Sequence, residues 1–383
     1  MKEKAKRGVQ GEKLPQDQGR EGKNQPQKDS SSSTFAYGKL PKDFFDNVIF
    51  TNLGKKRGEV LVGPSHGFDN CVIKIGTDYV MVCTCDPLSF IPKLGPEDSA
   101  WLSVNLLASD LSTSGFRPQY VMLEFNLPPR MPLDQFEKYW KALSSECARL
   151  GISIVGGHTG KFEGCDYTII GGGTMFSVGS IKACLTPSGA SVGDKVILTK
   201  GAAIAATGIL SRSFPNKVRD SLGNALYDKA CAYFRKISVV DDALTAAEVG
   251  IRSQGVTAMH DSTEGGVLSS LYELAAASSL GIRVEKSSIQ ISEETSAVCN
   301  LFGIDALTSL SEGSLVLACA PPKANEIVES LAKKDIPASI VGELTKAEYG
   351  RRIVDQGVES TINYPITDPY WNAYYNAIRK GWN

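Results

Sequence analysis

The stretch Gly67-Phe68-Asp69-Asn70-Cys71-Val72-Ile73 sets a glycine and an aspartate directly before a run of apolar residues. This pattern predicts a turn that leads into a β-strand, and a lone acid beside a glycine is commonly a turn former. Acids or histidines beside apolar runs recur further along the chain. The stretches that carry them are Thr84-Cys85-Asp86-Pro87-Leu88, Val104-Asn105-Leu106-Leu107-Ala108-Ser109-Asp110-Leu111, Gly156-Gly157-His158-Thr159-Gly160-Lys161 and His260-Asp261-Ser262-Thr263-Glu264-Gly265-Gly266.

Each of these stretches has a functional and a structural interpretation. Asp86 follows an expected buried strand, where α/β folds place ligand contacts, although an aspartate there also caps turns. Asp110 shares the half-buried face of an expected helix with two leucines. An unpaired carboxylate on that face would be costly, so it should meet a cation or several donors unless it lies at the rim and reaches water. Asp261 to Glu264 also fits a helix capping box, which needs no ligand.

The three histidines of the chain, His66, His158 and His260, all fall within glycine-bearing stretches that we expect to be turns. This concentration favours a functional interpretation of those turns. The standard nucleotide fingerprints G-x-x-x-x-G-K-[ST] and G-x-G-x-x-G are absent from the sequence. Walker-type and Rossmann-type nucleotide sites are therefore not expected.

The pattern of apolar residues divides the chain into four parts. A length of 383 residues suits two ordinary domains. Residues 1–36 are polar and are expected to be disordered. Strands and helices alternate over residues 37–180 and again over 181–345, and apolar steps of three and four predict a helix at 132–150. Residues 346–383 form an aromatic-rich extension that is expected to pack on a surface.

Composition and charge exclude several classes of protein. The 41 Lys and Arg residues nearly balance the 42 Asp and Glu residues, so there is no global field that would attract nucleic acid or a membrane surface. No apolar run is long enough for a membrane span, and the start of the chain lacks the apolar core of a signal peptide. We therefore expect a cytoplasmic protein with a small-molecule substrate. Cys83 and Cys85 should share a strand face, which permits metal binding but is more often packing.

Taken together and in order, the quoted stretches resemble the superfamily of aminoimidazole ribonucleotide (AIR) synthetase, selenophosphate synthetase, thiamine monophosphate kinase and the hydrogenase-maturation protein HypE. The similarity spans about residues 37–345 and is strongest to the AIR synthase-related members of this PurM-like superfamily. It implies an α/β (α+β) fold of two domains. An N-terminal four-stranded sheet would pair with its twin into a barrel at the centre of a homodimer, and an α/β sandwich would follow. ATP would lie in a groove near the interface.

The resemblance also implies roles for individual residues. Magnesium would be held by four acids, namely Asp69, Asp86, Asp110 and Asp261, which supply the hard oxygen ligands that Mg²⁺ needs. ATP would contact these four and also Gly67, Asn70, Gly156, Gly157, Thr159 and Glu264. His158 would move a proton, and Lys161 or Lys200 would contact phosphate oxygens.

Three departures from the superfamily's patterns leave the function open. Asp69-Asn70 stands where many members have two consecutive acids, which places a second magnesium in doubt. The Gly-Gly-His-Thr motif matches selenophosphate synthetase, but the N-terminal arm lacks that enzyme's cysteine. The sequence ends Lys380-Gly381-Trp382-Asn383, without the terminal cysteine of the hydrogenase-maturation protein.

The leading hypothesis is an enzyme that uses ATP and Mg²⁺ to phosphorylate or activate an oxygen of a small molecule. The alternatives are a nucleotide-binding assembly or regulatory protein with weak turnover, or a factor related to hydrogenase maturation. The substrate itself stays undetermined by the sequence.

Overall fold

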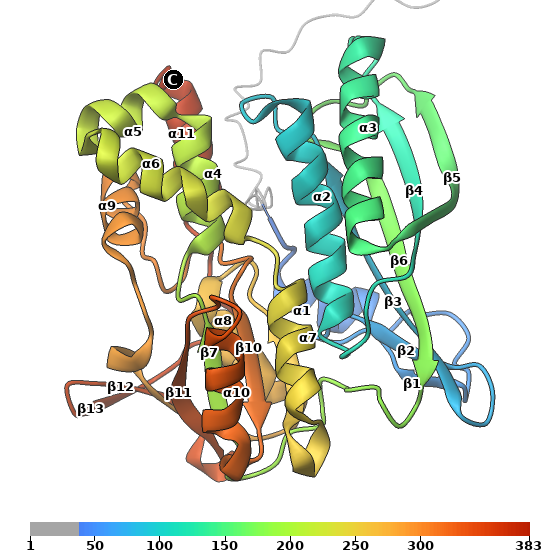
Figure 1. The fold of residues 1–383 in the computed structure, drawn as a ribbon, viewed down its shortest axis with the longest axis vertical. Helices are drawn as coiled ribbons and strands as arrows, with labels where there is room; N and C mark the ends of the chain where they lie inside the picture. The colour runs from blue at the N-terminus through green and yellow to red at the C-terminus, as the bar shows by residue number, and fades with distance from the viewer. Residues whose placement is uncertain (1–37) are drawn as a thin grey trace, which may run out of the picture. The chain divides into compact units, whose positions relative to one another are not determined.

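The computed structural model describes residues 38–383, so the expected disordered tail at 1–36 lies outside the described residues. Each half of this part contains one β-sheet with helices against it, which confirms the α/β class (Figure 1). Among residues 38–383, no helix has both the length and the apolar content that crossing a bilayer requires.

The first sheet has six strands, two more than the four implied by the resemblance. The short β1 adds antiparallel to β2, and β5 adds parallel to β4 at the opposite edge. The six strands of this sheet lie in the order β1-β2-β3-β6-β4-β5. The strands are β1 (Val60–Val62), β2 (Cys71–Lys74), β3 (Tyr79–Ser89), β4 (Tyr120–Leu127), β5 (Ser153–Lys161) and β6 (Ile169–Ser180).

Two long helices, α2 (Gly95–Ser112) and α3 (Leu133–Leu150), cover one face of this sheet (Figure 1). The expected helix at 132–150 agrees with α3, because its apolar stripe, including Leu143 and Cys147, packs into the core. Gly151 ends α3 with a left-handed backbone (φ 76°), a conformation that glycine adopts without a steric penalty. The face away from α2 and α3 leaves large apolar side chains exposed, among them Tyr79, Tyr120 and Met122.

The second sheet lies between two helical layers. Along β7, Val196 and Leu198 enter the core on one face, while Ile197 enters the core on the other. The sheet order is β13-β12-β9-β11-β7-β10-β8. The strands are β7 (Lys195–Thr199), β8 (Val256–Asp261), β9 (Gly281–Glu285), β10 (Leu315–Cys319), β11 (Ala338–Thr345), β12 (Arg351–Asp355) and β13 (Val358–Thr361).

The layers on this sheet are built from helices spread over the second half of the chain. One layer contains α7 (Val240–Val249) and α10 (Ala324–Ala332). On the opposite face α8 (Gly266–Ala277) packs on the sheet. The same core also contains residues of α4 (Ile204–Ser213), α5 (Pro215–Leu222), α6 (Asn224–Ala232), α9 (Glu293–Phe302) and α11 (Tyr370–Arg379). Helix α7 also buries Val240 and Leu244 in the core of the first half, so it packs between the halves. The short α1 (Lys42–Phe44) precedes the first sheet.

The last part of the chain is continuous with the second half. Strand β12 pairs in parallel with β9, so the sheet extends past residue 345, where the sequence pattern placed a boundary. Tyr370 and Tyr374 of α11 are almost fully buried in the core of this half. The aromatic residues of the extension therefore contribute to the core as well as covering a surface.

Two expected glycine turns are strands in the structure. His158 lies inside β5, and His260 lies inside β8 next to its last residue. Asp261 pairs with Leu315 across the sheet, and α8 begins only at Gly266, with no side-chain cap at its first turn. The capping-box interpretation of Asp261 to Glu264 is therefore wrong, because ladder pairing holds Asp261 in the sheet.

The exposed apolar face of the first sheet leads to a prediction about assembly. We expect a homodimer that covers this face, because an apolar patch over several strands is costly to leave in water. Met122→Glu should place a charge in the covered face and shift the protein in light scattering from about twice 41.1 kDa to 41.1 kDa. The matched control is Leu133→Glu, which adds the same charge at an exposed leucine on α3. A wild-type protein that is monomeric at micromolar concentration would contradict the prediction.

Candidate functional site

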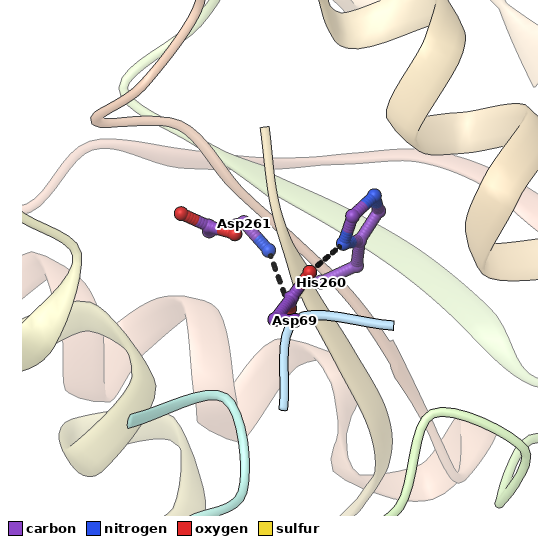
Figure 2. A group of neighbouring side chains, drawn as sticks. All are labelled: Asp69, His260 and Asp261. Carbon is purple, nitrogen blue, oxygen red and sulfur yellow. Dashed lines mark hydrogen bonds and ion pairs between the residues drawn. The ribbon is translucent and has the colours of Figure 1, made fainter. Parts of the chain in front are cut away.

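Asp69 from the loop before β2 meets His260 and Asp261 at the end of β8 (Figure 2). The His260 Nδ1 and Asp69 Oδ1 atoms are 2.5 Å apart, and the Asp261 backbone N–H donates to Asp69 Oδ2 at 3.2 Å. One ligand atom from each of the three residues lies within 4.8 Å of the others. Asp69 therefore forms one cluster with His260, which is 191 positions further along the chain, and with Asp261, which is 192 positions further along.

The loop that carries Asp69 approaches helix α8 closely at Gly67. Gly67 has φ 73°, and a Cβ atom there would lie 2.6 Å from Cβ of Glu273. Both the backbone conformation and the contact require glycine. Gly67 therefore acts by letting the Asp69 loop lie against the second half of the chain.

Asp110 of α2 faces the same cluster, as does Asp86 of β3. Thr84 Oγ1 donates to Asp110 Oδ2 at 2.9 Å and also contacts the Asp69 carbonyl at 2.9 Å. Asp86, Asp69 and Asp261 all act electrostatically on Asp110. Asp69 and Asp261 therefore share one group of ligand atoms, and Asp110 and Asp86 lie near enough to interact with it electrostatically.

Asn70 points its amide into the end of α2. Its Nδ2 donates to the Asp110 carbonyl at 3.0 Å and to Thr113 Oγ1 at 2.9 Å. Its Oδ1 is buried and has no hydrogen-bond partner. These contacts connect Asn70 to the helix that presents Asp110, and they leave one amide oxygen available to a donor or a cation.

Burial and mutual repulsion raise the pKa of three of the clustered acids. Burial raises the pKa of Asp86 to about 7, and the nearby Glu264 adds to that rise while Lys39 opposes it. Burial and Asp69 raise the pKa of Asp261 to about 7. Burial, followed by Asp261 and Asp86, raises the pKa of Asp110 well above its ordinary value. A cation in this position would relieve the repulsion.

Lys39 supplies a positive charge at this site that the sequence did not reveal. Its Nζ donates to Thr263 Oγ1 at 3.0 Å, and its backbone N–H donates to Glu264 Oε2 at 2.7 Å. Lys39 is exposed, and the carboxylates of Glu273 and Glu264 interact electrostatically with its ammonium group. Burial acts to lower the pKa of Lys39, yet Glu273, Glu264 and other acids outweigh it and raise the pKa. A single lysine in a polar stretch carries no sequence signal.

His260 lies between two carboxylates. Its Nε2 is 2.9 Å from Glu273 Oε2, and the Tyr364 hydroxyl donates to Glu273 Oε1 at 2.8 Å. Burial acts to lower the pKa of His260, but Asp69 and Glu273 outweigh it and raise the pKa well above its ordinary value. Glu273 was missed by the sequence analysis, although a glutamate among the leucines of an apolar helix was an available signal.

A second group of expected site residues lies apart from the acids. Gly156, Gly157, His158, Thr159 and Lys161 belong to the edge strand β5. Across the sheet, Asp86 on β3 pairs with Gly173, Gly173 pairs with Leu123, and Leu123 pairs with Gly157 on β5. Strand β5 is therefore three strand spacings, or about 14 Å, from Asp86.

Contacts made by the side chains of this second group also point elsewhere. Lys161 Nζ donates to the Met131 carbonyl at 2.6 Å, and the His158 ring lies near that of Phe162. A single chain therefore does not bring His158 or Lys161 to the four acids. Lys200 also lies elsewhere, because its buried Nζ contacts the Ser238 carbonyl at 2.7 Å and Asp242 at 3.0 Å.

The donor set at the acidic cluster fits a hard divalent cation. The Oδ1 atom of Asp261 is buried and lacks a hydrogen-bond partner. Carboxylate oxygens are the ligands that Mg²⁺ prefers in proteins, and four carboxylates gather here. Both ring nitrogens of His260 face carboxylates, so this imidazole orients Asp69 and offers no lone pair to a metal.

Two curated relatives cover most of the chain. A hydrogenase expression/formation protein of Methanocaldococcus jannaschii is 28% identical over 347 residues, which is 87% of this chain and 96% of the relative. The carbamoyl dehydratase HypE of Rhizobium leguminosarum is 26% identical over 293 residues, which is 73% of this chain and 79% of the relative.

Two solved structures share the fold. ThiL complexed with AMPPCP and TMP superposes with a TM-score of 0.65 at 18% identity, over 86% of this chain and 98% of that one. The hydrogenase maturation protein HypE in complex with ATP gives a TM-score of 0.61 at 21% identity, over 86% and 93%. Their likeness confirms the two-domain PurM-like architecture.

Family models account for both halves of the chain. The N-terminal domain of the AIR synthase related proteins matches residues 67–178, which include Asp69, Asp86 and Asp110. The C-terminal domain of the same family matches residues 191–355, which include His260 and Asp261. The chain therefore belongs to the AIR synthase-related family.

Proposed function

We propose that this protein is an enzyme that uses ATP and Mg²⁺ to phosphorylate or activate an oxygen of a small-molecule substrate. The observation that carries the proposal is the buried cluster of Asp69, Asp86, Asp110 and Asp261, contributed by both halves. Folding such a cluster is costly unless a cation neutralises it in the working state. The ATP and AMPPCP complexes of proteins with the same fold support the choice of nucleotide.

The chain's own groups would act on the phosphates by position and charge. The four aspartates would hold Mg²⁺, which when bound offsets negative charge on the transferring phosphoryl group. His260 holds the Asp69 carboxylate through Nδ1, and Thr84 holds that of Asp110. Lys39 places an ammonium group beside the acids, where it can contact a phosphate oxygen. His158 and Lys161 stay predictions, because within one chain they lie on a different part of the sheet.

A second candidate is a nucleotide-binding factor of hydrogenase maturation. It is favoured by the description of one relative as a hydrogenase expression/formation protein. Asn70 also favours reduced turnover, because its amide nitrogen is engaged by α2 where an acid would offer a second carboxylate. Binding without turnover distinguishes this candidate from the enzyme.

Calorimetry and turnover measurements test these proposals together. We expect ATP binding that strengthens with Mg²⁺, followed by release of ADP or phosphate with at least one member of a panel of carboxamide, formyl and phosphate-ester substrates. An absence of ATP binding at millimolar concentration would overturn both proposals. Binding without release across the panel would favour the maturation factor.

The variant Asp110→Asn tests whether Asp110 binds magnesium or has only a structural role. The amide keeps the side-chain shape but removes the charge that a cation requires, so stabilisation by Mg²⁺-ATP should be lost. In metal-free protein at pH 8 the same change should raise the melting temperature, by about 2 °C for each ~1 kcal/mol of repulsion removed. Thermal melts with and without Mg²⁺-ATP measure both effects. Asp134→Asn, at an exposed aspartate of α3, is the control. Wild-type stabilisation by Mg²⁺-ATP in Asp110→Asn would remove Asp110 from the site.

The raised pKa values predict how stability changes with pH when the metal is absent. Between about pH 4 and 7 the folded chain keeps protons on Asp86 and Asp261 that the unfolded chain releases. The free energy of unfolding should therefore rise as the pH falls from 8 to 5. The raised pKa of His260 acts in the same direction. The stability that the protonated imidazole contributes is complete below about pH 6.5, and it is lost as the pH rises through the pKa of His260 in the folded protein.

Melting temperatures in EDTA across this pH range provide the measurement. Asp86→Asn should flatten the dependence, and saturating Mg²⁺ should do the same because the cation replaces the protons. A melting temperature that is constant or that falls between pH 8 and 5 would show that these acids are not under repulsion.

A further inference from the structure

The segment at residues 364–371, which runs from the loop after β13 into the first turn of α11, makes three side-chain contacts with the residues around the acidic cluster. These contacts are Tyr364 to Glu273, Asp368 to the Gly265 backbone and Trp371 to Glu264. The segment lies beyond residue 355, where the family match ends. It therefore lies outside the two regions that the family models match.

Tyr364 stands at the end of a chain of hydrogen bonds that reaches Asp69. Its hydroxyl donates to Glu273 Oε1 at 2.8 Å, and the other oxygen of Glu273 lies 2.9 Å from His260 Nε2. His260 Nδ1 then meets Asp69 Oδ1 at 2.5 Å. The side chains of Asp69, His260 and Glu273 are only 4%, 4% and 8% exposed, so water does not compete for these bonds. The Tyr364 ring is held in turn by stacking on Tyr272, with centroids 4.5 Å apart.

Trp371 and Asp368 hold the loop that follows Asp261. Trp371 Nε1 donates to Glu264 Oε1 at 2.8 Å, while Lys39 N–H donates to the other oxygen of Glu264. Asp368 Oδ2 accepts from the Gly265 N–H at 2.9 Å. Gly265 has φ 83°, and a Cβ there would lie 3.3 Å from the Ile366 carbonyl oxygen. The segment at 364–371 thus fits closely against this loop.

We propose that the segment at residues 364–371 completes the site, with Tyr364 and Trp371 as positioning residues for Asp69 and Glu264. The inference rests on the proposed function and deepens it, because it assigns the orientation of a metal-binding carboxylate to a part of the chain outside the family match. Tyr364 acts through Glu273 and His260, and Trp371 acts on Glu264 directly. Neither residue needs to touch the nucleotide.

Tyr364→Phe removes only the hydroxyl that begins this chain of bonds. We expect the Mg²⁺ concentration that gives half of the maximal gain in ATP affinity to rise by up to about tenfold. Direct partners of metal-binding residues contribute at least that much to metal affinity, and Tyr364 acts on Asp69 through two intervening side chains. The affinity for ATP in EDTA should stay within about twofold of wild type, since a positioning role acts only through the metal. Trp371→Phe removes the Nε1–H donor that holds Glu264, whose charge acts on Asp86. It should therefore change the Mg²⁺ dependence in the same direction. Titration calorimetry with ATP at a series of Mg²⁺ concentrations measures both quantities.

The chain offers matched controls away from the site. Tyr349→Phe removes a tyrosine hydroxyl that donates to Glu359 at an exposed position, and Trp382→Phe changes a tryptophan that packs on Phe302. Both should bind Mg²⁺ and ATP as the wild type does. Thermal melts show that each variant is folded, and Trp371→Phe carries the test if Tyr364→Phe does not fold.

The outcomes separate this inference from the proposed function. Wild-type protein that shows no Mg²⁺-dependent ATP binding would overturn both. Wild-type binding with an unchanged Mg²⁺ dependence in both folded variants would overturn only the positioning role. A loss of ATP affinity that is equal with Mg²⁺ and in EDTA would also overturn it, because it would indicate a purely structural effect.

Discussion

The central constraint in this structure is the gathering of four aspartates, of which the Asp69 and Asp261 side chains are almost fully buried and Asp86 and Asp110 are half-buried. Asp69, Asp86 and Asp110 come from the first half, and Asp261 comes from the second. Each would lose hydration on folding and repel its neighbours, which is costly without compensating charge. His260 and Lys39 supply part of that compensation from within the chain. The remaining charge fits a divalent cation, and this need connects the fold to the proposed chemistry.

Three contacts in the fold position residues of the two halves of the chain at this cluster. Gly67 lets the Asp69 loop lie against α8, since any side chain there would collide with Glu273. Helix α7 packs its apolar residues into the first core and so holds the two halves together. Ladder pairing with β10 keeps Asp261 in line at the end of β8. These contacts bring Asp69 and Asp261, which are far apart in the sequence, into one group of ligand atoms.

The hydrogen bonds around Asp69 extend well beyond the acids. His260, Glu273 and Tyr364 form a buried series of polar contacts from β8, α8 and the segment that follows β13. Buried polar groups need partners, and each member here satisfies the next. That segment leads into α11, which buries Tyr370 and Tyr374 in the second core, so its position is set by packing as well as by hydrogen bonds.

The α/β class, the helix at α3 and the identity of the acids that gather could all be predicted from the amino-acid sequence, because apolar periodicity and ordered short motifs are local properties. The sequence also singled out His260, although only as part of an expected turn. The tertiary structure alone decided that His158 and Lys161 lie on an edge strand about 14 Å away from Asp86, since strand order is set by long-range pairing. It alone revealed Lys39, Glu273 and Tyr364, whose roles depend on contacts between residues more than ten positions apart. No local pattern marks a lysine, a glutamate or a tyrosine that works through a partner brought near only by folding.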